Sequence, residues 1–109
     1  MTYQEISEMV AAVGLPYAYY QFPDDTVKAP PFVCFYFPGN DDFVADNINY
    51  SKIEQLVIEL YTDNKDFALE SRIESILAAN ELVYSRVETV IDTEKMFEVT
   101  YTMEVQING

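Results

Sequence analysis

The stretch from Pro38 to Glu70 constrains the fold most strongly, because three different patterns follow one another within it. A polar, acidic segment, Asp41 to Ser51, comes first, and apolar and polar residues then alternate from Leu56 to Tyr61. A period of two residues predicts a strand with one buried face. The turn formers at 62–64 can cap a helix over residues 65–79, so a strand here runs directly into a helix that packs on the same sheet.

The predicted helix over residues 65–79 is amphipathic. Its apolar stripe consists of Leu69, Ile73, Ile76 and Leu77. Since these positions recur every three or four residues, they share one face of the helix. We expect Glu70, Arg72 and Glu74 to lie outside that face.

The flanking sequence predicts a further helix and four further strands. Thr2 and Glu5 stand at capping-box spacing, and the apolar residues after them have helical period, which predicts a helix over residues 3–13. The remaining strands are expected at Pro16–Phe22, Phe32–Phe37, Val83–Asp92 and Glu94–Ile107. The order α-β-β-β-α-β-β, with short connections, predicts a single α+β domain over residues 1–109. We expect a two-layer sandwich in which two helices cover one face of a mostly antiparallel sheet of about five strands.

Composition argues against several classes of function. Nineteen acidic residues against six basic ones give a formal net charge of −13. Affinity for nucleic acid comes largely from Lys and Arg that displace counterions, so we expect no specific binding to DNA. The sequence has no apolar run near the ~18 residues that a membrane helix needs and no signal-peptide pattern, so we expect an intracellular protein with no membrane partner.

The residue types that most enzymes and metal sites use are scarce. There is no histidine, and the one cysteine, Cys34, sits in an apolar run where a small buried side chain is expected. The acidic segment around Asp41, Asp42 and Asp46 lacks the alternating ligand spacing of a calcium loop. We therefore expect no enzymatic activity, no catalytic residues, no metal and no cofactor, and we interpret the acidic segment as a protein contact.

Contacts with other proteins are the interpretation that the aromatic content favours. Nine tyrosines in so small a domain exceed what a core needs, because each hydroxyl needs a partner or water, and tyrosine is enriched at interfaces. The long terminal hairpin can extend beyond the helices and carry such contacts. The residues that we expect in protein–protein contacts are Asp41, Asp42, Phe43, Asp46, Tyr50, Asp92 and Thr93.

A set of short segments gives the chain a resemblance to a known family. The segments are Pro16-Tyr17 through Phe22-Pro23, Pro31-Phe32-Val33, Phe43, Asp46-Asn47, Tyr50, Glu59-Leu60-Tyr61-Thr62, Lys65-Asp66-Phe67, Glu70 and Glu94 to Val99. Through them the chain resembles the small tail-terminator (tail-completion) proteins of long-tailed phages and prophages. The resemblance spans nearly the whole chain and rests on packing and turn residues.

The resemblance implies a structural role in the neck or tail of a virion assembled in the host cytoplasm. It implies a homo-oligomeric ring, typically a hexamer, that caps the tail tube and joins it to the filled head. The implied partners are the major tail tube protein and a head–tail connector protein, and DNA would pass through the ring without specific binding. An acidic lumen suits that passage, because it repels phosphates.

Two other interpretations stay open on the sequence. A neighbouring connector subunit, of the head-completion or stopper type, would build a ring by the same logic and differ in its partner. An acidic DNA mimic that inhibits a nuclease or repressor would use the charge of −13 directly. An enzyme is a third and more distant alternative.

Overall fold

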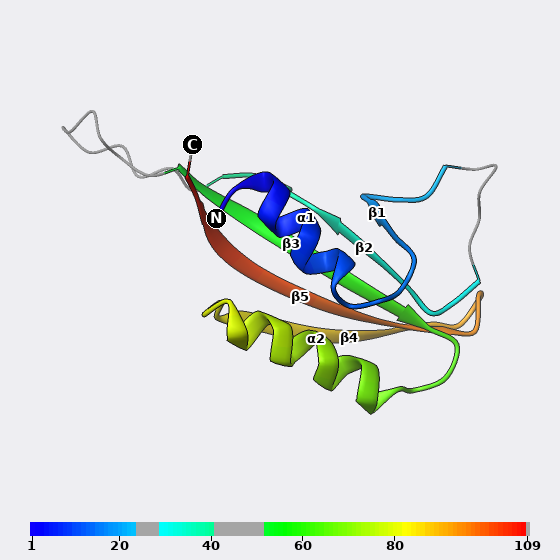
Figure 1. Cartoon of the computed structure of the whole chain (residues 1–109). Coiled ribbons are helices and arrows are strands. Elements are labelled where there is room, and N and C mark those ends of the chain that lie inside the picture. The colour runs from blue at the N-terminus through cyan, green and yellow to red at the C-terminus, as the bar shows by residue number, and fades with distance from the viewer. Residues whose placement is uncertain (24–28, 41–51, 109) are drawn as a thin grey trace.

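The structure is a computed structural model, and it describes residues 1–23, 29–40 and 52–108. The helices are α1 (Tyr3–Ala11) and α2 (Phe67–Ala79), and the strands are β1 (Tyr17–Tyr19), β2 (Phe32–Tyr36), β3 (Lys52–Thr62), β4 (Tyr84–Ile91) and β5 (Met96–Ile107). They form one five-stranded sheet in the order β1-β2-β3-β5-β4 (Figure 1). Every neighbouring pair is antiparallel except β1 and β2. The predicted α+β class and element order are confirmed.

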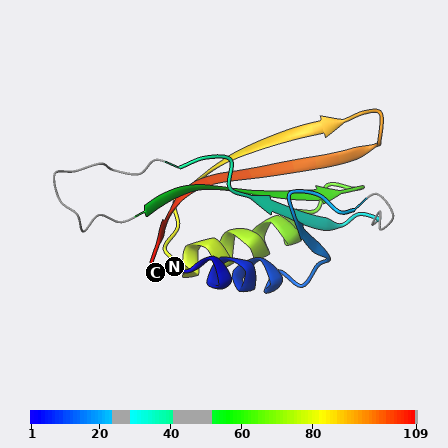
Figure 2. The same cartoon turned by 90° about the horizontal axis from the view of Figure 1, so that it is seen from above.

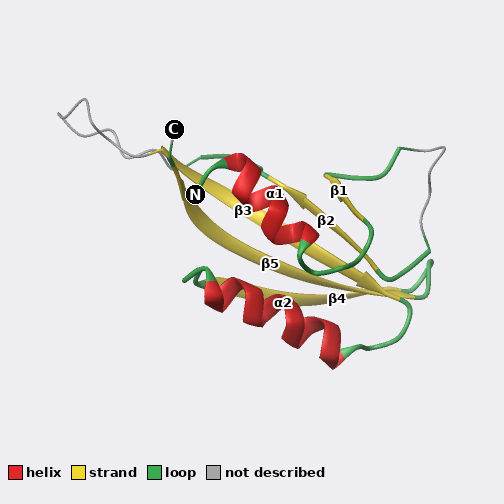
Figure 3. Ribbon diagram, viewed as in Figure 1, coloured by secondary structure: helices red, strands yellow, loops and turns green. Residues whose placement is uncertain are grey.

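Both helices lie on the same face of the sheet, and no helix in the described part of the chain covers the other face (Figures 2 and 3). The core fills the space between the two layers. Its helical part consists of Ile6, Met9, Val10, Leu69, Ile73 and Leu77, and its sheet part includes Val33, Phe35, Leu56, Ile58, Leu60, Val99, Tyr101, Met103 and Val105. The sheet residues alternate along each strand, as a strand with one buried face requires.

Helix α1 forms as its sequence predicts and ends early. The side chain of Thr2 accepts a hydrogen bond from the Glu5 amide at 3.1 Å, and the Glu5 carboxylate accepts one from the Thr2 amide at 2.8 Å, so the capping box is present. The helix ends at Ala11, two residues before the predicted 3–13, because the chain turns into Gly14 at φ +87°. Arg72 of α2 donates a hydrogen bond to the Val13 carbonyl at 2.8 Å and ties the two helices together.

The first strand differs from the prediction of a strand over Pro16–Phe22. β1 has only three residues, and it runs parallel to β2. Tyr20 has a positive φ of 67°, a conformation that interrupts an extended strand. Its amide still donates a hydrogen bond to the Phe35 carbonyl at 2.7 Å, so residues 20–22 turn over β2 instead of extending the pairing.

The burial of Glu70 on helix α2 contradicts the expectation that this residue lies outside the packed face. The residue is only 5% exposed. Lys65 and Arg86 both contact its carboxylate, and paired charge is the usual condition under which a glutamate is buried. Arg72 and Glu74 also make tertiary contacts from the flanks of the helix, with Val13 and Tyr101 respectively.

Candidate functional site

Of the residues predicted to contact other proteins, Asp92 and Thr93 lie within the described part of the chain. They begin the turn over residues 92–95 that joins β4 to β5. Two hydrogen bonds close the turn: the Glu94 amide donates to the Ile91 carbonyl at 3.2 Å, and the Lys95 amide donates to the Asp92 carbonyl at 3.3 Å. Its residues are exposed, so the tip of the hairpin is accessible for contact. The predicted contact residues Asp41, Asp42, Phe43, Asp46 and Tyr50 lie outside the described residues.

The described ends of the acidic segment and the hairpin turn lie at opposite ends of the sheet. Asn40 forms a bridge with Glu54, and Lys52 pairs with Ile107 at the end of β5. The turn lies at the other end of β5, where the strand begins at Met96 (Figure 1). The two predicted contact segments are therefore attached to two different ends of the subunit.

The edge formed by β4 presents apolar side chains to solvent. β4 pairs with β5 on one side, and it is the last strand of the sheet. Val87 is 60% exposed and Val90 is 54% exposed, while Val83, just before the strand, is 88% exposed. A sheet edge with unpaired backbone groups and apolar side chains is a template for pairing with another chain.

The opposite edge, formed by β1, is rich in tyrosine. Tyr17, Tyr19 and Tyr20 are 41%, 55% and 60% exposed. The Tyr19 hydroxyl accepts a hydrogen bond from the Phe37 amide at 3.1 Å, and its ring packs edge-on against Phe35 at 5.4 Å. These rings are held in place by the strands and remain accessible, as aromatic residues at protein interfaces are.

An aromatic pocket of about 520 Å³ opens on the sheet face that carries no helix. Alternate residues of β2 and β3 form its floor, and residues 20–22 form one wall. The described residues that line it are Tyr20, Gln21, Phe22, Phe32, Cys34, Tyr36, Glu59, Tyr61, Glu94 and Met96. Sequence reasoning missed this pocket and interpreted the excess of tyrosine as protein contacts in general.

Ring contacts hold the walls of this aromatic pocket. Phe32 stacks on Tyr61 with ring centroids 4.9 Å apart, which follows from their pairing across β2 and β3. Phe22 packs edge-on against Phe32 at 5.4 Å, and Tyr20 packs edge-on against Tyr36 at 5.5 Å. Together they leave Cys34 only 3% exposed although no helix covers it, which confirms the expected buried cysteine.

The carboxyl groups beside the aromatic pocket are close to one another. The Tyr61 hydroxyl lies 2.6 Å from a Glu98 oxygen and 3.2 Å from a Glu59 oxygen. Burial, and then the charge of Glu98, raise the pKa of Glu59, and burial raises the pKa of Tyr61. Burial also raises the pKa of the Cys34 thiol to about 11, with a smaller contribution from Glu59, so the thiol is protonated and unreactive at neutral pH.

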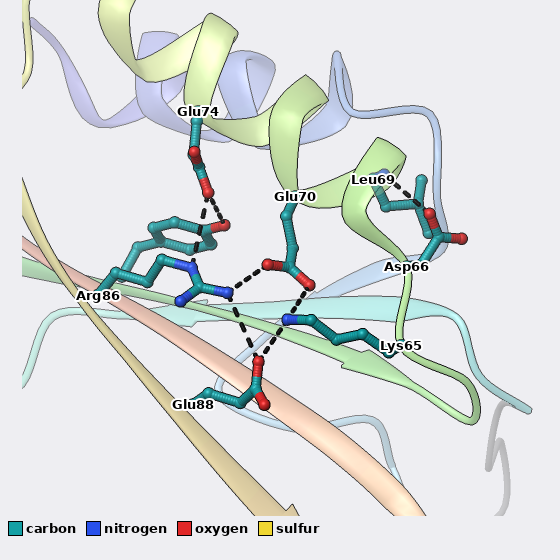
Figure 4. Close-up of polar contacts among 8 residues, drawn as sticks. Lys65, Asp66, Leu69, Glu70, Glu74, Arg86 and Glu88 are labelled. Carbon is teal, nitrogen blue, oxygen red and sulfur yellow. Dashed lines mark hydrogen bonds and ion pairs between the residues drawn. The ribbon is translucent and has the colours of Figure 1, made fainter.

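A second cluster of charges joins α2 to the β4–β5 hairpin (Figure 4). The Glu70 carboxylate lies between Lys65, whose Nζ is 2.6 Å from Oε2, and Arg86, which contacts Oε1. Both cations also contact Glu88 of β4. The hydrogen bond to Glu70 raises the pKa of Arg86 above its ordinary value. Arg86 therefore stays a cation, and the cluster fastens a helix to a strand.

Comparison with known proteins gives a structural neighbour. No protein-family model matches the chain, and no curated protein matches it. A solved structure described as "Virion of native gene transfer agent (GTA) particle" contains a chain with a TM-score of 0.59 and 16% sequence identity. The match covers 98% of this chain and 91% of that chain. At this identity the likeness establishes a shared fold over nearly the full length of both chains.

The described residues contain neither a cluster of potential metal ligands nor a helix that could span a membrane. Within residues 1–23, 29–40 and 52–108, no three Cys, Asp or Glu side chains are grouped as metal ligands would be. No helix in the same ranges is long and apolar enough to cross a membrane.

Proposed function

We propose that this chain is a structural protein of a phage-like virion and, within it, a tail-terminator subunit. The observation that carries the proposal is the fold shared along 98% of the chain with a protein of a gene transfer agent virion. The resemblance of its sequence segments to tail terminators supports the finer assignment. In this role copies of the chain form a ring, typically of six, that caps the tail tube and joins it to the head.

The surfaces of the subunit support a ring. A closed ring uses two different surfaces of each subunit, because each copy contacts one neighbour on either side. The chain has two unlike sheet edges, the valine-bearing edge of β4 and the tyrosine-bearing edge of β1. We propose that neighbouring copies meet through these edges and through the turn that contains Asp92 and Thr93.

The segment from Asp41 to Tyr50 is the second part of the proposal. Its described neighbours Asn40 and Lys52 lie at the end of the sheet opposite to the hairpin turn. A terminator has to contact the tube on one side and the head connector on the other. We propose that this segment contacts the tail tube or an adjacent subunit, while the hairpin turn, besides its contact with a neighbouring copy, faces the head connector.

Deletion of the coding sequence from the genome that carries it tests the proposal. Loss of a terminator leaves filled heads and separate tails of irregular length in electron micrographs, and expression of the chain in trans restores joined particles. Joined tails of normal length in the deletion strain would contradict the proposal. Emptied heads beside tails of normal length would indicate a head-completion subunit instead, and normal particles with lost protection from a host nuclease would indicate a DNA mimic.

The same complementation assay tests the contact segments. Deletion of residues 41–46 is expected to abolish complementation, while the far-ultraviolet circular dichroism of the purified protein stays unchanged. Val87→Asp on the β4 edge is expected to reduce the yield of joined particles at least tenfold. Val83→Asp, at a valine that is also exposed but lies outside the strand, is the matched control and is expected to complement normally. Full complementation by the deletion and by Val87→Asp would refute the assigned contacts.

A further inference from the structure

We propose that the aromatic pocket on the helix-free face of the sheet receives an arginine side chain from a partner protein. This inference rests on the residues of the pocket and does not require that the chain forms a ring. The described residues that line it come from β2, β3, β5 and the segments after β1 and before β5. No arginine or lysine is among them.

The walls of the pocket suit a flat cation. Five aromatic rings line it, and their mutual contacts at 4.9 to 5.5 Å hold three pairs in fixed orientations. A cation over the face of an aromatic ring is attracted by the ring quadrupole. Arginine stacks on such rings with its guanidinium plane, whereas lysine offers a strongly hydrated point charge.

The carboxyl groups supply the complementary charge. Glu59 and Glu94 line the pocket, and Glu98 lies behind Tyr61, from whose hydroxyl it accepts a hydrogen bond at 2.6 Å. Burial, and then the charge of Glu98, disfavour ionisation of Glu59, and a guanidinium between these groups and the opening relieves the repulsion between the two carboxylates. An arginine paired with a carboxylate makes two parallel hydrogen bonds, which adds orientation as well as energy.

The surroundings of the opening favour an arginine on a protein over a free amine. The volume of about 520 Å³ exceeds what a guanidinium alone needs, and it admits the methylene stem as well. Tyr20, 60% exposed at the rim, and the exposed turn over residues 92–95 border the pocket. These features give a partner surface to contact around the inserted side chain.

Binding is expected to depend on pH through the groups that face the pocket. From β3 these are Glu59 and Tyr61, from the turn before β5 Glu94, from β2 Cys34 and Tyr36, and from the segment after β1 Tyr20; Glu98 of β5 lies behind Tyr61. Burial, and then the charge of Glu98, raise the pKa of Glu59 above its ordinary value, so this carboxyl loses its proton at a higher pH than an exposed glutamate does. Arginine binding therefore strengthens as pH rises and Glu59 loses its proton.

Nuclear magnetic resonance titration of the full chain with N-acetyl-arginine methylamide tests the inference. We expect saturable shifts confined to the pocket, with a dissociation constant in the millimolar range. Glu59→Gln is expected to weaken binding at least fivefold and Phe22→Leu at least threefold. Glu104→Gln, an acid on the same sheet face outside this pocket, is the charge-matched control and is expected to change affinity less than twofold.

Two further titrations distinguish an arginine side chain from other cationic ligands. N-acetyl-lysine methylamide and spermidine are titrated under the same conditions, and both are expected to bind at least threefold more weakly than the arginine probe. Spermidine binding as tightly as the arginine probe would overturn the inference in favour of a polyamine site. Shifts that do not saturate, that lie outside the pocket, or that are equal in Glu59→Gln and the parent chain would overturn it altogether.

Discussion

The buried carboxylate of Glu70 allows a prediction in which removing the exposed partner costs more than removing the buried one. The Glu70 side chain is only 6% exposed, and Arg86→Met removes one of the two cations that contact its carboxylate. Breaking a buried ion pair by removing one partner costs about 3–5 kcal/mol, because the other charge is left in a poorly hydrated site. Lys65 still lies 2.6 Å from Glu70 and offsets part of this.

The magnitude follows from the remaining contacts. Arg86 is 35% exposed on its side chain, so solvent screens part of its interaction, and we expect a loss of about 2 kcal/mol in the free energy of unfolding. At a urea m-value of about 2 kcal/mol/M, this lowers the unfolding midpoint by about 1 M. Glu70→Gln is expected to cost only about 1 kcal/mol, because the stranded cations keep other partners: Lys65 contacts Glu88, and Arg86 lies 3.6 Å from Glu74.

Urea denaturation followed by far-ultraviolet circular dichroism measures these differences. Lys95→Met is the matched control, since it removes one positive charge from an exposed turn and is expected to shift stability by less than about 0.5 kcal/mol. An equal loss in Arg86→Met and Lys95→Met would show that only net charge matters. A larger loss in Glu70→Gln than in Arg86→Met would refute the role assigned to burial.

Three further predictions concern other parts of the chain. Burial raises the pKa of Glu59 above its ordinary value of 4.5, so its contribution to stability is full below that value and is lost as pH rises through the folded pKa. The melting temperature of Glu59→Gln is therefore expected to rise relative to that of the parent chain between about pH 4 and about pH 7. A difference in melting temperature that stays constant with pH would contradict this. Thr2→Ala removes the capping-box acceptor of α1 and is expected to cost about 1 kcal/mol in urea unfolding, with Ser in its place restoring stability. The Cys34 thiol, with its pKa raised to about 11 and 3% exposure, is expected to react with iodoacetamide at about pH 8 at least tenfold more slowly in the folded chain than in urea, and equal rates would show that it is accessible.

The layered fold follows from local patterns in the sequence. The alternation from Phe97 to Ile107 and the capping box at Thr2 are decided by neighbours within a few residues, so the sequence contains them in full. The length and direction of β1 could not be predicted in the same way. Its direction depends on pairing with β2 across the connection that follows Phe22, and its end depends on the backbone of Tyr20.

The candidate surfaces were harder to predict, because they combine residues that are distant in sequence. The spacing of the helix places Glu70 beside apolar residues, and its burial is tolerated because Lys65 and Arg86, the latter sixteen positions away in the sequence, both pair with its carboxylate. The aromatic pocket depends on the register that sets Phe32 opposite Tyr61. Of the predicted contact segments, the turn at Asp92 is exposed, and the role of that turn and of the acidic segment stays a prediction.

The most direct test of the proposed function is a cryo-electron microscopy reconstruction of the neck of the particle whose genome encodes the chain. We predict a closed ring at the head-proximal end of the tail tube, in which each subunit shows a five-stranded sheet with two helices on one face. The β4 edge of one copy should contact the next copy around the ring. A neck built without this subunit, or the chain found only outside the particle, would contradict the proposal.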